Sequence, residues 1–130
     1  MVPFALRKTV SGSYDEVLAR LPDLMKAGGF GVLTEIDVRE TLKKKLGVDF
    51  RRYKILGACN PPFAHQALEV ELEIGLVMPC NFVVYEGDDG RTVVAAVDPS
   101  QTMAALGNEQ LAGLAAEVQK RLQAILDQIE

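Results

Sequence analysis

Hydrophobic and polar positions alternate along the chain with two different periods, which divide it into predicted strands and helices. Residues 4–10 form a short strand-like run that ends in the turn residues Ser11, Gly12 and Ser13. Ser13 and Glu16 have the spacing of a capping box, in which each side chain pairs with a backbone N–H of the other residue. The helix that follows should bury one apolar stripe: Tyr14, Val17, Leu18, Leu21, Leu24 and Met25.

Proline and glycine interrupt and end this first helix. Pro22 lies inside the apolar stripe and has no backbone N–H, so we expect a kink or a helix in two pieces. Gly28 and Gly29 should end the helix. Residues 30–36 are rich in β-branched and aromatic side chains, which predicts the second strand.

Short elements fill the middle of the chain. Asp37 is a suitable N-cap for a helix from about Val38 to Leu46, which Gly47 should end. Residues 52–58 alternate charged and apolar side chains, as expected for a third strand. Asn60 is followed by two prolines and should cap a helix of roughly ten residues.

The last third of the chain carries the clearest patterns. Two β-rich runs, residues 81–86 and 91–97, flank the turn sequence of residues 87–90 and predict a hairpin. Asn108 should cap a long final helix whose apolar positions keep helical spacing: Leu111, Leu114, Ala115, Val118, Leu122, Ile125, Leu126 and Ile129. This order predicts an α+β fold in which helices cover one face of a mainly antiparallel sheet.

Length and composition fit a single globular domain spanning residues 1–130. The net charge of −4 argues against a nucleic-acid partner, because phosphate recognition needs a basic surface. No apolar run is long enough to cross a bilayer, and residues 1–6 lack the pattern of a signal peptide. We therefore expect a soluble, cytoplasmic protein without a membrane partner.

Charge is distributed unevenly along the chain. Basic residues gather in one segment: Lys43, Lys44, Lys45, Arg51, Arg52 and Lys54. Acidic residues follow with no basic residue between them: Glu69, Glu71, Glu73, Glu86, Asp88 and Asp89. This asymmetry is compatible with a homodimer or with an anion at the basic segment, although a charge run is more often a solvated face.

Three short motifs are similar to those of one protein family. They are Gly28-Gly29-Phe30-Gly31-Val32, Gly57-Ala58-Cys59-Asn60-Pro61 and Pro79-Cys80-Asn81. In these motifs, and over nearly its whole length, the chain resembles the domain-of-unknown-function 302 (DUF302) proteins of bacteria and archaea. The resemblance implies a strand-helix-four-strand-helix domain with the layout of the TATA-binding-protein-like folds, and it brings no established activity. Function has to be argued from a site, because one fold serves many activities.

Two cysteines are the main candidates for a site. Cys59 directly precedes the proposed N-cap Asn60, where a helix dipole favours a thiolate. If the third and fourth strands meet, Cys59 and Cys80 could form a dithiol, a transient disulfide or a soft-metal pair. Both can equally be packing residues. Asn60 and Asn81 are candidate ligand contacts, although their more ordinary roles are as caps and turn residues.

The remaining motifs predict neither a metal nor a hydrolase. Cys59, His65 and Cys80 form at most a weak metal set, because structural zinc takes four ligands and no Cys-x-x-Cys pair is present. No Ser-His-acid arrangement is evident. Two functions stay open: a non-catalytic module that binds a small ligand or self-associates, which we favour, and a thiol-dependent redox, sulfur-handling or soft-metal protein. The sequence assigns no cofactor and no catalytic residue.

Overall fold

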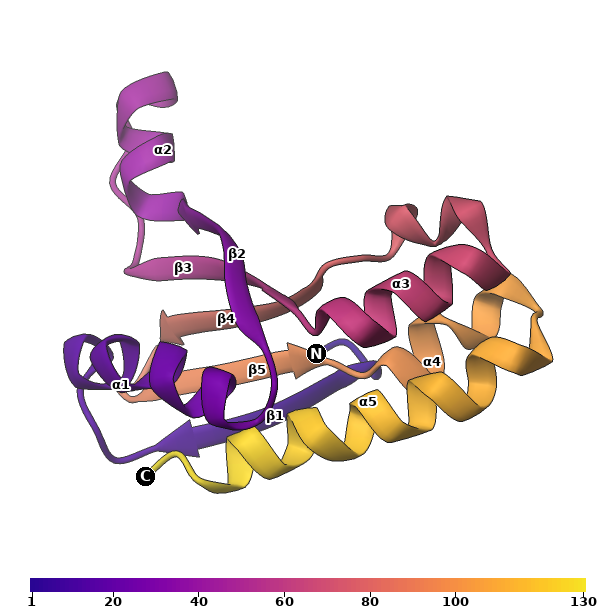
Figure 1. Ribbon diagram of the computed structural model, residues 1–130. Helices are drawn as coiled ribbons and strands as arrows, with labels where there is room; N and C mark the ends of the chain where they lie inside the picture. Colours follow the sequence, from indigo (N-terminus) through magenta and orange to yellow (C-terminus); the bar gives the residue numbers. More distant parts are fainter.

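The computed structural model describes residues 1–130 and contains one five-stranded antiparallel sheet in the order β1-β5-β4-β3-β2 (Figure 1). The strands are β1 (Ala5–Val10), β2 (Gly31–Asp37), β3 (Tyr53–Cys59), β4 (Cys80–Glu86) and β5 (Thr92–Val97). The α-helices are α1 (Tyr14–Ala27), α2 (Val38–Leu46), α3 (Pro61–Val70), α4 (Pro99–Thr102) and α5 (Glu109–Asp127). Two 3₁₀ helices, η1 (Leu72–Leu76) and η2 (Ala104–Leu106), complete the fold. The predicted α+β class is confirmed.

The predicted N-cap explains where α1 begins, but the effect expected of Pro22 in the middle of the helix is only partly seen. The Ser13 hydroxyl oxygen accepts a hydrogen bond from the backbone N–H of Glu16 at 3.2 Å, as the sequence predicts. The helix then continues through Pro22, so the expectation of two separate pieces is wrong. Leu21 and Met25 of the same helix are fully buried, and their packing holds the helix together. Pro22 itself is exposed, so water can reach the carbonyl that its missing N–H leaves free.

The glycines after α1 allow a close approach between two helices. The N–H of Gly28 donates to the carbonyl of Leu24 at 3.1 Å, which ends α1. A Cβ at Gly28 would lie 2.6 Å from Cγ1 of Ile125 on α5, so no other residue fits there without a shift. Gly29 follows with a φ of 91°, a left-handed conformation that favours glycine.

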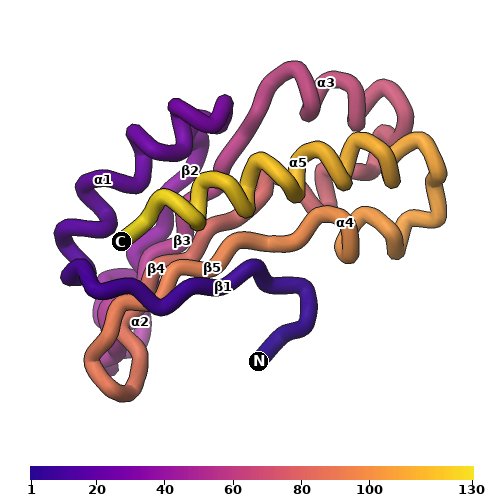
Figure 2. The backbone as a smooth tube through the Cα atoms, turned by 90° about the horizontal axis from the view of Figure 1, so that it is seen from below, coloured from indigo at the N-terminus to yellow at the C-terminus, as the bar shows by residue number.

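Two hydrophobic cores lie along α5. Helices α1 and α5 cover the same face of the sheet (Figure 2), and beneath them 18 buried residues form the larger core. It contains Phe82, Val84 and Val94 of the sheet and the C-terminal half of α5. The smaller core has five residues: Ala67, Ile74, Met103, Leu111 and Ala115. Every predicted stripe position of the final helix is buried except half-buried Leu114.

The other end of the sheet is much less covered. Helix α2 buries no side chain, and it projects beyond the β2 edge, away from the other helices (Figure 1). On the sheet face opposite α1 and α5, Tyr53 and Tyr85 stack with ring centroids 5.4 Å apart. None of the helices has both the length and the apolar character needed to cross a membrane.

Candidate functional site

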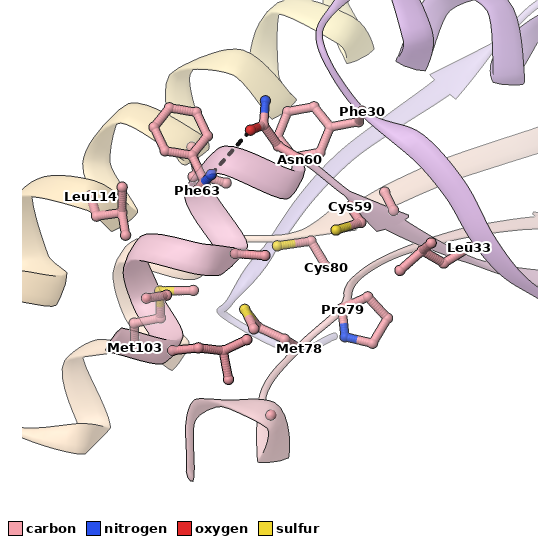
Figure 3. A pocket seen from close by; sticks show the side chains of 16 residues that line it. Phe30, Leu33, Cys59, Asn60, Phe63, Met78, Pro79, Cys80, Met103 and Leu114 are labelled. Atoms are coloured by element: carbon pink, nitrogen blue, oxygen red, sulfur yellow. Dashed lines mark hydrogen bonds between the residues drawn. The ribbon is translucent and has the colours of Figure 1, made fainter. Parts of the chain in front are cut away.

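A cavity of about 350 Å³ lies between α3, α5 and the adjoining ends of β3 and β4 (Figure 3). It is found where the two cores meet, with Phe30 and Val118 of the larger core and Ala67 and Met103 of the smaller core in its wall. Of its 16 lining residues, 13 are hydrophobic and none is charged. Its volume falls in the range of small-molecule sites, roughly 300–1,000 Å³.

Asn60 fixes the start of the helix that forms one wall. Its side-chain oxygen accepts a hydrogen bond from the N–H of Phe63 at 3.2 Å, drawn as a dashed line in Figure 3. Its side-chain N–H donates to the carbonyl of Gly29 at 2.9 Å, which ties α3 to the loop before β2. On the outside, the Arg121 guanidinium lies 5.0 Å from the centroid of the Phe63 ring. Asn60 therefore lines the cavity with an amide whose oxygen and one N–H are already engaged within the protein.

The structure places both cysteines in the wall of this cavity. Cys59 is the last residue of β3 and Cys80 the first of β4, and Ala58 pairs with Cys80 across the two strands. Cys80 is buried and Cys59 only half-buried, and both thiols are free. Burial raises the pKa of the Cys80 thiol to about 11, and a negative charge on nearby Cys59 adds to this increase. The two thiols therefore share one cavity but differ in access.

The cavity wall also contains two methionine thioethers. Met78 and Met103 line the same cavity, so both cysteines and two of the four methionines in the chain gather here (Figure 3). Methionine is flexible and polarizable, and it fills irregular apolar space. The cavity wall is therefore apolar, soft and rich in sulfur.

The other two sequence-predicted residues lie elsewhere. Asn81 pairs with Gly57 in the sheet and is exposed; it borders the opposite sheet face, because successive side chains of a strand alternate between faces. His65 is exposed on α3, with its Nε2 3.1 Å from a carboxylate oxygen of Glu69, and it does not line the cavity. No three His, Cys, Asp or Glu side chains have an arrangement suited to a metal ion.

Comparison with known proteins assigns the chain to a family. Residues 6–129 match the family model described as "Domain of unknown function DUF302". The chain belongs to the DUF302 family. It is also similar to the crystal structure of an uncharacterized conserved DUF302 protein from Bacillus stearothermophilus, with 35% identity and a TM-score of 0.92. That alignment covers 99% of this chain and 100% of the other. No curated protein gives a significant match.

Several lining residues of this DUF302 chain escape sequence reasoning. Met103 belongs to a segment without a periodic pattern, and Leu33 lies in a strand whose pairing the sequence does not reveal. Both reach the cavity only through contacts between distant segments. The sequence indicates Met78 only indirectly, because this residue immediately precedes the Pro79-Cys80-Asn81 motif.

The chemistry that the DUF302 cavity offers is narrow. It has no charged lining residue, and Asn60, its one amide, is already hydrogen-bonded. Charged ligands, or ligands that need several hydrogen bonds, would lose water with little compensation. An apolar molecule, or one that interacts with sulfur, meets no such cost.

Proposed function

We propose that this DUF302 protein is a binding module that holds a small, uncharged, largely apolar molecule in the cavity between α3, α5 and the sheet. The observation that carries the proposal is the cavity itself, with about 350 Å³ of space and 13 hydrophobic residues among its 16 lining residues. Small-molecule sites are concave and lined mainly by hydrophobic and aromatic side chains. A space of this size at the junction of two cores therefore supports a binding role.

The size of the cavity limits the ligand. Water occupies about 30 Å³ per molecule in the liquid, so the cavity corresponds to roughly a dozen water molecules. Leu33 and Leu68 line the cavity and are 66% and 39% exposed, which places them at its mouth. A polar group on the ligand is best accommodated there, where it keeps contact with water.

Filling the cavity tests the proposal. Ala64 lines it from α3, so Ala64→Phe should occupy part of the space and abolish the fluorescence enhancement of a small apolar dye such as a dialkylaminonaphthalene. Gln66→Phe is the matched control, because it adds the same side chain to the exposed side of the same helix. Equal dye binding by the two folded variants would contradict the proposal. Near-ultraviolet circular dichroism verifies that each variant retains its packing.

A second function, thiol chemistry, is favoured by the placement of both cysteines in one cavity wall and by the electrostatic influence of Cys59 on Cys80. Oxidation to a disulfide would remove two electrons and two protons, which diamide accepts to become a hydrazine. Mass spectrometry after diamide treatment should then show a dithiothreitol-reversible bond between Cys59 and Cys80. Under a purely binding function, Cys59→Ser leaves dye binding intact; under the thiol function, it abolishes the redox response.

A further inference from the structure

Most of the exposed large apolar side chains of this molecule lie in two stretches of the chain, residues 32–50 and 68–76. Of its twelve exposed large hydrophobic residues, nine lie on β2, on the α2 arm (residues 38–52), or on α3 and η1. The most exposed of these nine are Leu33, Leu46, Leu72 and Leu76, at 66%, 69%, 82% and 81%. A concentration of this kind is typical of a surface that another molecule covers.

Helix α2 is the most unusual part of this surface. It has nine residues, none of them buried, and it projects past the β2 edge (Figure 1). Isolated helices of this length are marginal in water, and most helices in proteins are stabilised by packing an apolar face. Val38, Thr41 and Leu42 are half-buried against the sheet, whereas the last turn, with Leu46, is exposed and free to make a further contact.

Strand β2 supplies an unpaired edge next to this helix. It hydrogen-bonds with β3 only, so its other edge carries free N–H and C=O groups. Edge strands are often protected by charged residues, proline or a bulge; β2 has Glu35 and Asp37 but neither lysine nor proline. Its register shifts once, between Val32 and Thr34, which leaves residues 34–37 regular for pairing.

The two ends of the β2 edge carry opposite charge. At one end, Arg39 and Lys45 of α2 make no ion pair with a carboxylate. At the other end, Glu69 and Glu73 of α3 and η1 have no lysine or arginine partner, and no lysine or arginine occurs between residues 54 and 91. A partner that places acidic residues at the basic end and basic residues at the acidic end would therefore be attracted at both ends.

We propose that the partner is a second copy of this chain, joined about a twofold axis through antiparallel pairing of the two β2 strands. β2 runs from Gly31, which pairs with Cys59 beside the start of α3, to Asp37, where α2 begins. Reversing the strand across the axis brings the α2 arm of each copy against α3 and η1 of the other. The contact forms twice, as in any isologous dimer.

This arrangement also affects the cavity. Leu33 and Leu68 stand at its mouth and on the proposed contact surface, so the partner's α2 arm would close the cavity from outside. This last step rests on the proposed binding function. The proposed dimer does not depend on the binding function, and its test measures the mass of the protein rather than the binding of a ligand.

Charge reversal tests the pairing. Arg39→Glu with Lys45→Glu gives an acidic arm, and Glu69→Lys with Glu73→Lys gives a basic α3–η1 surface. Each variant alone places like charges together at both contacts and should raise the dissociation constant of the dimer by roughly tenfold or more. An equimolar mixture of the two should form heterodimers, because both contacts are then attractive. Sedimentation velocity, or size exclusion with light scattering, at micromolar concentration measures these masses.

Lys26→Glu with Lys120→Glu is the matched control for the acidic-arm variant, since it makes the same change in net charge on exposed positions of α1 and α5. It should remain dimeric. A monomeric wild-type protein at high micromolar concentration would overturn the proposal. So would a dimer that both reversals leave intact, which would favour the open sheet face around Tyr53 and Tyr85 instead. All exchanged residues are exposed, and far-ultraviolet circular dichroism verifies the fold.

Discussion

Brief alkylation of the folded protein should label Cys59 well before Cys80. Iodoacetamide reacts with the thiolate, so its rate depends on both ionisation and access. Cys80 is only 8% exposed, whereas Cys59 is half-buried at the end of β3. Ionisation and access therefore both disfavour Cys80.

The size of the expected difference in labelling rate follows from the pKa of about 11 that burial gives the Cys80 thiol. Each pH unit below the pKa lowers the thiolate fraction about tenfold, so about one Cys80 thiol in a thousand is ionised at pH 8. An ordinary exposed cysteine, with a pKa of about 8.5, is about one quarter ionised at that pH. Cys80 should therefore react roughly 200-fold more slowly than such a thiol, before restricted access slows it further.

The assay is peptide mapping by mass spectrometry after timed labelling. Raising the pH from about 8 to about 9 should accelerate Cys80 labelling about tenfold, because the thiolate fraction is still far from saturation. In guanidinium chloride the two cysteines should react at similar rates. Labelling of Cys80 as fast as Cys59 in the folded protein, or a Cys80 rate that does not change with pH, would refute the reasoning.

Four further substitutions test the packing of the core and of the site. Leu122→Ala truncates a fully buried leucine and should lower the free energy of unfolding by about 2–5 kcal/mol in a urea titration. Gly57→Ala should also destabilise the protein, because the new Cβ would lie 2.9 Å from Pro79. Gly113→Ala on α5 meets no neighbouring atom and should stabilise the protein by up to about 1 kcal/mol. Because burial raises the Cys80 pKa above its ordinary value to about 11, stability should fall as the pH rises from that ordinary value through about 11. Cys80→Ala should flatten the fall in thermal melts.

Features that depend on neighbouring residues could be predicted from the sequence. The N-caps Ser13, Asp37, Asn60 and Asn108 each accept a backbone hydrogen bond within three residues, so their signal is local. The final helix was predictable for the same reason, since its apolar spacing is a property of one segment. Pro22 shows the limit of such rules, because burial of its neighbours outweighs the cost of one missing hydrogen bond.

The candidate site depends on contacts that no local pattern encodes. Cys80 faces the cavity together with its cross-strand partner Ala58, and Cys59 lines it from the last position of β3. A register shifted by one residue would turn the β4 side chains to the other face. The same parity directs Asn81 away from the cavity, although its motif resembles that of Asn60. Met103 reaches the cavity through the small core formed with α3, η1 and the first half of α5.

The unequal size of the two cores has a consequence for how a molecule could enter. Eighteen buried residues hold the sheet, α1 and the end of α5, whereas five hold α3, η1 and the beginning of α5. Proteins open locally in cooperative units, and the units with the least buried apolar contact open most often. Amide hydrogens of α3 and the first half of α5 should therefore exchange with solvent faster than those near Leu122, in the same helix. Transient opening of the smaller unit gives a small molecule a route inward while the sheet stays folded.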